Sequence, residues 1–345
     1  MKQRKFWQQA CGDTDRNYAS ICLKWGVILN GPGDFGAWPE CELLLLEEGV
    51  SSRKVTDLRR FAEDMTDGDV VVLRLGTKDV LAVGVIVGEY EWLEIFGDVD
   101  GWDIQHVRRV KWLWSDLARP HQFKTYDLKQ GDTTQKLTSK VVIDWIDNLA
   151  LDFDSGTEVP VLPSGEGNLV SFEVVSDFLF DSGISSNAIE TLSNEMDELV
   201  RIARWYQKYD DPSEFETVAY LAIPLLRALG WTPQKMAIEW RKVDIALFNS
   251  LPRRDESLSV VVEAKKKGNA CLSAYSQALS YAEGKKGCSR LIVTDGLRYG
   301  VYVKTTKSFE LKAYFNITDL RANYPIYECG GVLEALRIMA PEWTD

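Results

Sequence analysis

The first 150 residues contain several short runs in which hydrophobic positions dominate or alternate with polar ones, a pattern that predicts β-strands separated by turns. The four clearest runs are ASICLKWGVIL, GDVVVLRLG, VLAVGVIVGEYEW and HVRRVKWLW. The stretch SSRKVTDLRRFAEDM has apolar residues at helical spacing and predicts one amphipathic helix. Gly-Asp and Gly-Pro pairs punctuate the strands. Residues 1–150 are therefore expected to form a small β-barrel domain with one or two helices.

The pattern changes after residue 150. Residues 151–171 are rich in Gly, Pro and Ser and predict a linker, and residues 172–209 have apolar residues at helical spacing. Residues 151–210 are thus interpreted as a linker followed by a helical connector. From residue 211 to 345 the elements predicted run helix, strand, strand, helix, strand, strand, which favours an α/β domain with a mixed sheet.

Charge is distributed unevenly along the 345 residues, whose formal net charge is -12. Residues 151–200 contain 11 acidic residues and no Lys or Arg, whereas residues 201–345 carry 21 basic and 17 acidic residues. The acidic stretch is interpreted as a solvated connector, with an intramolecular mimic of DNA as the alternative. The mildly basic last third remains compatible with a nucleic-acid partner.

The sequence lacks the signals of membrane proteins, secreted proteins, zinc sites and ATP sites. The chain shows no apolar run long enough for a membrane span and no signal peptide after its basic start, so a cytoplasmic protein without a membrane partner is expected. Six scattered cysteines and two histidines offer no zinc spacing. No GxxxxGK[ST] motif is present, so no ATP site is predicted.

Charged residues near the end of one predicted strand point to chemistry. The strand SVVVEAKKKG places Glu263 and Lys265 on the same face, since they are two residues apart, and the preceding strand VDIALF contributes Asp244. Two antiparallel strands can bring these three residues together. Carboxylates that lie close to each other ionise together most easily around a hard divalent cation, so Mg²⁺ or Mn²⁺ is the predicted cofactor.

Five ordered blocks extend this observation: ETVAYLAIPLLRALGW, VDIALF, VVVEAKK, QALSYAE and LIVTDGLRYGVYV. Over residues 212–303 the chain resembles the PD-(D/E)xK nuclease superfamily, and within it the nuclease domain at the N-terminus of type I restriction subunits. Val243 stands where that motif usually has proline. The resemblance implies a restriction-endonuclease-like α/β fold.

The resemblance also implies residue roles. It makes Asp244 and Glu263 metal ligands together with the main chain of Ala264, and Lys265 the catalytic lysine. Three further positions match the family's catalytic set, namely Glu216, Gln277 and Tyr281. Four alternatives stand beside these roles. Ser213-x-x-Glu216 is also a capping box, and Lys265 begins a lysine run that could be a solvated strand end. Tyr281 could pack in the core, and Asp244 with Glu263 could be a surface pair.

The tryptophan-rich first part, over residues 18–115, resembles PUA, EVE and YTH-like barrels, which often hold a modified or flipped base in an aromatic pocket. Tryptophans at predicted turns or strand ends are the candidates for such a pocket, and basic residues on one strand are candidates for phosphate contacts. The predicted binding residues are Trp25, Trp38, Trp92, Trp102, His106, Arg108 and Arg109. Packing in the core is the alternative for every tryptophan.

The two resemblances together predict a Mg²⁺-dependent DNA endonuclease whose barrel reads modified DNA, as in a modification-dependent restriction or phage-defence enzyme. Cleavage of both strands needs two active sites, so a homodimer is expected. One alternative is a non-catalytic nucleic-acid reader with a relic nuclease fold. Another is a nuclease whose barrel binds RNA or a nucleotide ligand.

Overall fold

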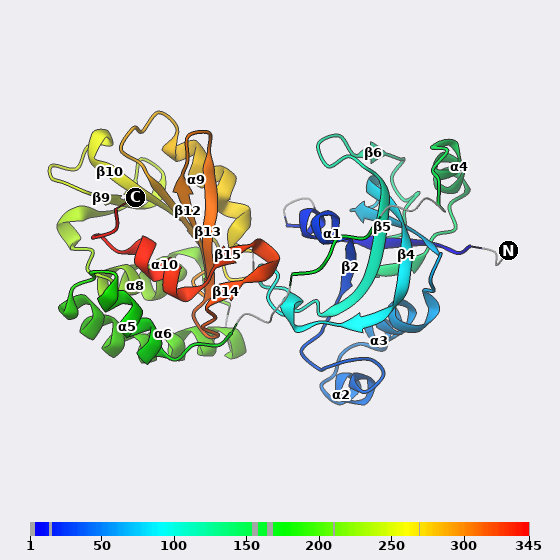
Figure 1. The fold of residues 1–345 in the computed structure, drawn as a ribbon, viewed down its shortest axis with the longest axis horizontal. Helices are drawn as coiled ribbons and strands as arrows, with labels where there is room; N and C mark the ends of the chain where they lie inside the picture. The colour runs from blue at the N-terminus through cyan, green and yellow to red at the C-terminus, as the bar shows by residue number, and fades with distance from the viewer. Residues whose placement is uncertain are drawn as a thin grey trace. The chain divides into compact units, whose positions relative to one another are not determined.

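The chain forms two compact units, Met1–Pro163 and Ser164–Asp345, in a computed structural model (Figure 1). The structure describes residues 4–13, 16–153, 158–163, 168–209, 211–268 and 270–344. Within these ranges no helix combines the length and the apolar composition that crossing a membrane requires. Each unit is built around its own mixed β-sheet.

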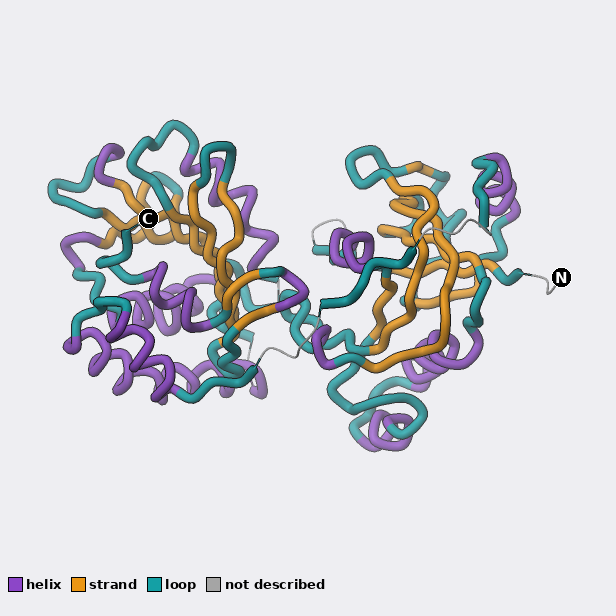
Figure 2. The backbone as a smooth tube through the Cα atoms, viewed as in Figure 1, coloured by secondary structure: helices purple, strands orange, loops and turns teal. Residues whose placement is uncertain are grey.

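The sheet of the first unit is curled into a half-barrel, as the orange strands of Figure 2 show. Its described strands follow the order β2-β5-β4-β3-β1-β7, with β6 paired to β4. β1 and β3 run parallel, and the other pairs are antiparallel. The strands are β1 (Phe6–Ala10), β2 (Val27–Asn30), β3 (Val70–Leu75), β4 (Asp79–Trp92), β5 (His106–Ser115), β6 (His121–Gln122) and β7 (Thr134–Lys136).

Part of one predicted strand is a helix. Residues 19–25 form α1 (Ala19–Trp25), which buries Ile21, Cys22 and Trp25 on one face. It ends at Gly26, whose φ of 58° suits the left-handed C-terminal cap. The strand β2 begins only after this glycine. The other helices of the unit are α2 (Cys41–Glu47), α3 (Ser52–Arg59), which runs into a π-helical turn (Arg60–Asp64), and α4 (Lys140–Asn148).

The sheet of the second unit carries the candidate catalytic strands. Its described strands follow the order β14-β15-β13-β12-β11-β10-β9-β8. β10 runs parallel to β11 and antiparallel to β9, so the C-terminal end of β10 lies beside the start of β9. The strands are β8 (Met236–Trp240), β9 (Val243–Phe248), β10 (Leu258–Ala264), β11 (Arg290–Thr294), β12 (Arg298–Lys304), β13 (Phe309–Asn316), β14 (Asn323–Tyr324) and β15 (Cys329–Gly330).

Helices cover both sides of this sheet. Figure 1 shows α9 on one side and α10 on the other, with α5, α6 and α8 beside α10. The stretch from α7 to α8 is helical throughout, through a π-helical turn (Val218–Ala222). The helices are α5 (Phe172–Asp181), α6 (Ser186–Tyr209), α7 (Glu214–Thr217), α8 (Ile223–Ala228), α9 (Tyr275–Ala282) and α10 (Val332–Met339).

The helical connector predicted over residues 151–210 belongs largely to the second unit. Val175 and Leu179 on α5, and Leu192 and Leu199 on α6, are buried in the same hydrophobic core as the strands of the second sheet. The unit therefore begins at Ser164 instead of residue 211. The reason is the apolar face of these helices, which is removed from water by packing on α8 and α10. Residues 154–157 and 164–167 of the predicted linker lie outside the described residues.

Candidate functional site

Asp244 and Glu263 lie on neighbouring strands at one end of the second sheet. The register pairs Ile245 of β9 with Val262 of β10, which places Asp244 next to the end of β10. Asp244 Oδ2 accepts a hydrogen bond of 2.7 Å from the main-chain N–H of Ala264. The predicted metal-binding residues Asp244, Glu263 and Ala264 are thus adjacent in the structure.

Lys265 joins these carboxylates to α9. Its Nζ donates to Glu263 Oε1 at 3.1 Å and to Gln277 Oε1 at 2.9 Å. Gln277 in turn donates from Nε2 to the hydroxyl of Tyr281 at 3.2 Å, as expected for residues four apart on one helix face. A chain of polar contacts therefore runs from the buried strand to the surface of α9, and it includes four of the predicted catalytic residues.

Glu263 has an unusual environment for a carboxylate. Its side chain is 1% exposed, and its Oε2 has no hydrogen-bond partner within the protein. Burial is the main cause that raises the pKa of Glu263 to about 7, and the charge of Asp244 raises it further. Burial also raises the pKa of Asp244, against the opposing effects of the Ala264 N–H and Lys265. Both shifts mean that the site disfavours two negative charges without a further cation.

The structure places Glu216 away from this cluster and brings Glu214 toward it. The Glu216 carboxylate accepts hydrogen bonds from the Ser213 N–H and hydroxyl, both 2.8 Å long, at the exposed start of α7. These bonds complete a capping box and lower the pKa of Glu216. Glu214 is half-buried; burial is the first cause of its raised pKa, and Lys265 and Asp244 also act on it.

Glu214 could have been identified from the sequence. Residues two apart on a helix point in directions about 200° different, so Glu214 and Glu216 cannot both face the sheet. The capping-box spacing from Ser213 assigns Glu216 to the helix end. Glu214 then remains as the acidic residue on the inner side.

The donor set of the site suits a divalent cation. The unpartnered, buried Glu263 Oε2 and the neighbouring Asp244 carboxylate are hard oxygen donors of the kind that Mg²⁺ and Mn²⁺ prefer. Among the described residues, no three or more Asp, Glu, His or Cys side chains gather closely enough to hold an ion by themselves. Mg²⁺ commonly binds through one or two carboxylates and keeps several waters. The pair Asp244 and Glu263 fits that mode.

The four predicted tryptophans of the first unit do not form one pocket. Trp25 and Trp38 are 8% and 6% exposed, and Trp38 packs in a small core with Leu45 and Leu58. Trp38 also donates from Nε1 to Glu63 at 2.7 Å. Trp92 is half-buried and donates to the Gly33 carbonyl. Packing therefore accounts for Trp25 and Trp38.

The predicted phosphate contacts of β5 are used inside the unit. Arg108 is 2% exposed and donates to the carbonyls of Phe61, Ala62 and Met65, where the π-helical turn ends. It acts as a cap for that turn, so its guanidinium is not presented to a phosphate. The half-buried Arg109 donates to the main-chain carbonyls of Trp25 and Pro160.

His106 is also internal. Its Nδ1 lies 2.6 Å from the Tyr90 hydroxyl, and its Nε2 lies 3.0 Å from the Pro32 carbonyl. Burial lowers the pKa of His106 to about 4, so the ring is neutral at physiological pH. A neutral, fully buried imidazole cannot serve as a phosphate contact.

One cavity of about 320 Å³ does open in the first unit, and Trp102 lines it. The Arg16 guanidinium lies 3.6 Å from the centroid of the Trp102 ring, and the Tyr18 ring meets Trp102 edge to face at 5.0 Å. The cavity is lined by Ala10, Gly12, Tyr18, Asn30, Gly31, Pro32, Lys54, Trp102, Asp103, Ile104 and Thr133.

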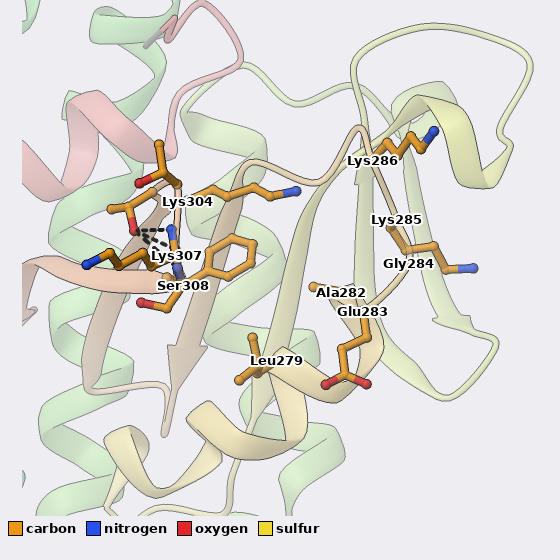
Figure 3. A pocket seen from close by; sticks show the side chains of 12 residues that line it. Leu279, Ala282, Glu283, Gly284, Lys285, Lys286, Lys304, Lys307 and Ser308 are labelled. Carbon is orange, nitrogen blue, oxygen red and sulfur yellow. Dashed lines mark hydrogen bonds between the residues drawn. The ribbon is translucent and has the colours of Figure 1, made fainter.

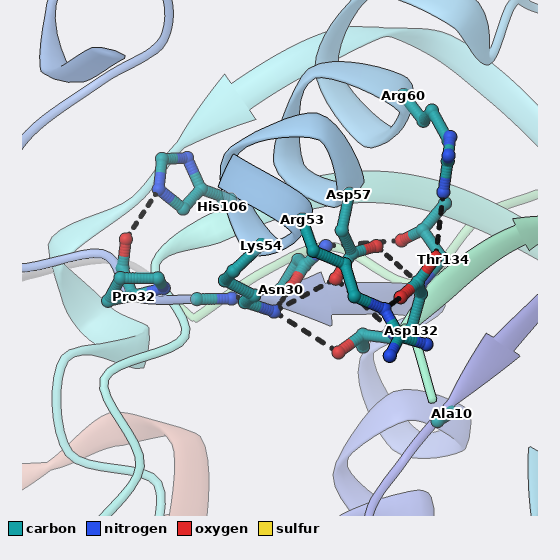
Figure 4. A network of polar contacts seen from close by, with 12 residues as sticks. Ala10, Asn30, Pro32, Arg53, Lys54, Asp57, Arg60, His106, Asp132 and Thr134 are labelled. Atoms are coloured by element: carbon teal, nitrogen blue, oxygen red, sulfur yellow. Dashed lines mark hydrogen bonds and ion pairs between the residues drawn. The ribbon is translucent and has the colours of Figure 1, made fainter. Parts of the chain in front are cut away.

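A polar network supports one wall of this cavity (Figure 4). Lys54 Nζ donates to Asn30 Oδ1 at 2.8 Å, to Asp57 Oδ2 at 3.0 Å and to Thr133 Oγ1 at 3.1 Å. Asp57 is 1% exposed and also accepts from the N–H of Thr134. The ammonium is therefore held in place by three acceptors, which fixes the Asn30 amide beside it.

Comparison with known proteins adds one match. A family described as a domain of unknown function (DUF8426) matches residues 17–138, which lie within the first unit. No curated protein and no solved structure matches the chain.

Proposed function

We propose that the second unit is a metal-dependent phosphodiester hydrolase with a restriction-endonuclease-like fold that cleaves DNA. The observation that carries this proposal is the buried Glu263 carboxylate, which has one unpartnered oxygen, beside Asp244 and bonded to Lys265. If these residues had only a structural role, burying their charges would cost free energy with no gain in function. A catalytic role explains why a strand that is otherwise apolar ends in these residues.

Each residue of the cluster then has a defined task. Asp244 and Glu263 would hold Mg²⁺ or Mn²⁺, which when bound supplies charge stabilisation at a phosphodiester oxygen. Lys265 orients the attacking water, because Glu263 and Gln277 fix the position of its Nζ. Tyr281 supports Gln277 through the hydrogen bond between them. Glu214 adds negative charge near Asp244, which strengthens the hold on a cation.

The test is cleavage of plasmid DNA with Mg²⁺, and with a chelator. Asp244→Ala should reduce the rate by about a hundredfold or more, because a metal contributes several kcal/mol to the transition state and each 1.36 kcal/mol is tenfold in rate. EDTA should have the same effect on the wild-type protein, and Mg²⁺ should restore it. A folded Asp244→Ala protein that cuts at the wild-type rate would contradict the site. Wild-type protein that binds DNA but never cuts it would favour the non-catalytic reader.

For the first unit, a reader of modified DNA remains our proposal, with its site moved to the cavity beside Trp102. The half-buried Trp102 supplies aromatic surface and Asp103 supplies a polar group, which is the combination that a base removed from its stack requires. RNA or a nucleotide in the same cavity is the alternative. Because two active sites are needed for a double-strand break, we propose that a homodimer is the active form.

A further inference from the structure

A second cavity lies in the second unit, between the end of α9 and the turn that joins β12 to β13 (Figure 3). Its volume is about 370 Å³. Four lysines line it, Lys285, Lys286, Lys304 and Lys307, with a single carboxylate, Glu283. Such a concentration of positive charge is notable in a chain whose net charge is -12. We propose that this lysine cavity binds the phosphate backbone of a nucleic acid.

The charge of the cavity comes mainly from three side chains. Lys285 is ion-paired with Asp255 and contributes less. Lys286, Lys304 and Lys307 are exposed, and Figure 3 shows Lys304 and Lys286 on opposite sides of the cavity, with Leu279 at its base. Exposed ammonium groups are strongly hydrated point charges. As ligands for such groups, the phosphates of a flexible backbone are better suited than a planar carboxylate. Such contacts release counterions from DNA and depend on salt.

The apolar part of the cavity favours a backbone over a free nucleotide. Phe309 is 9% exposed, and Lys304 Nζ lies 6.0 Å from the centroid of its ring. The ring therefore has little open face on which a base could stack. The cavity has lysine charges at its rim and little open aromatic surface inside, so it suits phosphates better than bases.

Strand β11 relates the cavity to the carboxylate site. At one end of β11, Thr294 pairs with Ala264; at the other, Arg290 pairs with Val303, the neighbour of Lys304. Four residue steps along a strand span about 13 Å. A contact at the cavity would therefore fall on the backbone of the same DNA molecule, a short distance from the phosphate that is cut. This step rests on the proposed nuclease function, whereas backbone binding itself does not.

The experiment measures binding of a short labelled DNA duplex to the full chain by fluorescence anisotropy, in EDTA, over a range of salt concentrations. The test variant combines Lys286→Gln, Lys304→Gln and Lys307→Gln. It should raise the Kd about tenfold or more at moderate salt and reduce the slope of log K against log salt by about 2 to 3. Replacement of the same three residues by Arg should preserve binding. Lys312→Gln, on β13 outside the cavity, removes one lysine charge and should change neither quantity, whereas each of the three cavity substitutions made singly should lower the slope by about 1.

Thermal melting of each variant shows whether it is folded, and the outcomes separate the two proposals. Equal Kd and slope for wild type and the triple Gln variant would overturn the lysine cavity and leave the nuclease assignment to the Asp244 assay. Failure of the wild-type protein to bind the duplex would overturn the lysine cavity, and the nuclease assignment would still be decided by the cleavage assay with Mg²⁺. If the triple Gln variant lost binding of a labelled mononucleotide but kept duplex binding, the cavity would be a nucleotide site, and the backbone proposal would be wrong.

Discussion

The two units differ in how residues chosen from the sequence are arranged in space. In the second unit, Asp244, Glu263 and Lys265 come together at the end of two paired strands. In the first unit, Trp25 and Trp38 are packed into the interior and Trp102 alone of the four tryptophans lines the cavity. The face of a strand on which a residue lies can be predicted from its neighbours in the sequence. Whether a large side chain is buried depends instead on distant segments that pack against it.

The largest expected effect separates packing from binding in the first unit. Trp38→Ala should lower the free energy of unfolding by about 3–5 kcal/mol, because a large buried side chain is removed from a core. Trp102→Ala should instead weaken binding of the cognate base by about 1–3 kcal/mol. Thermal melting and calorimetric titration with a panel of modified oligonucleotides measure the two quantities. If both variants lost stability, or both lost binding, the separate packing and binding roles of Trp38 and Trp102 would be contradicted.

The part of the fold that the sequence predicted is the part that local patterning determines. The strands β3, β4, β5, β9 and β10 and the helices α3 and α9 appear where periodicity places them. The sequence pattern does not predict α1, because Ile21, Trp25 and the apolar residues after Gly26 form one mostly apolar run. Glycine at position 26, with a left-handed φ, was the signal that divides them.

The candidate site residues follow the same rule. The spacing Glu263-x-Lys265 and the partner Asp244 could be predicted, since alternation along a strand decides their faces. The internal roles of His106 and Arg108 could not. Arg108 is occupied because a helical turn about 45 residues earlier ends beside it and offers three carbonyls. No feature near Arg108 in the sequence reveals that neighbour.

A second prediction sharpens the picture of the carboxylate site in the metal-free protein. Glu263 has a pKa of about 7 in the folded chain, above its ordinary value of 4.5. The folded state therefore binds more protons between these values, and stability falls as pH rises through that window and is level above it. Glu263→Gln cannot ionise and should be more stable than wild type at pH 8 by roughly 1–3 kcal/mol.

Thermal melting in EDTA across pH 4 to pH 8 is the measurement. The advantage of Glu263→Gln should shrink toward acidic pH and vanish near pH 4, where the wild-type carboxyl is already protonated. An advantage that is the same at every pH would mean that packing, and not ionisation, sets the stability of this position.

The smallest expected effects come from a matched pair on α7. Glu214→Gln should lower the cleavage rate by about tenfold, equivalent to about 1.4 kcal/mol, because it removes a charge close to Asp244 and Lys265. Glu216→Gln should leave the rate unchanged, since its carboxylate serves the capping box and glutamine can also occupy that position. Cleavage at saturating Mg²⁺ compares them. If Glu216→Gln lowered the cleavage rate more than Glu214→Gln, Glu216 would be the catalytic acidic residue that the family resemblance implied.

The buried residues that follow Glu214 hold the rotation of its helix, since Thr217, Val218 and Leu221 are fixed in the interior of the unit. A helix advances about 100° per residue, so the spacing between Glu214 and these residues determines whether its carboxylate points toward Asp244. Deleting one residue before Ser213 would leave that spacing intact. Inserting one residue between Glu214 and Thr217 would turn Glu214 by about 100° relative to the buried residues while leaving every acidic residue in the chain. In this unit the charge near the carboxylate pair therefore depends on spacing along a helix as much as on which residues the helix contains.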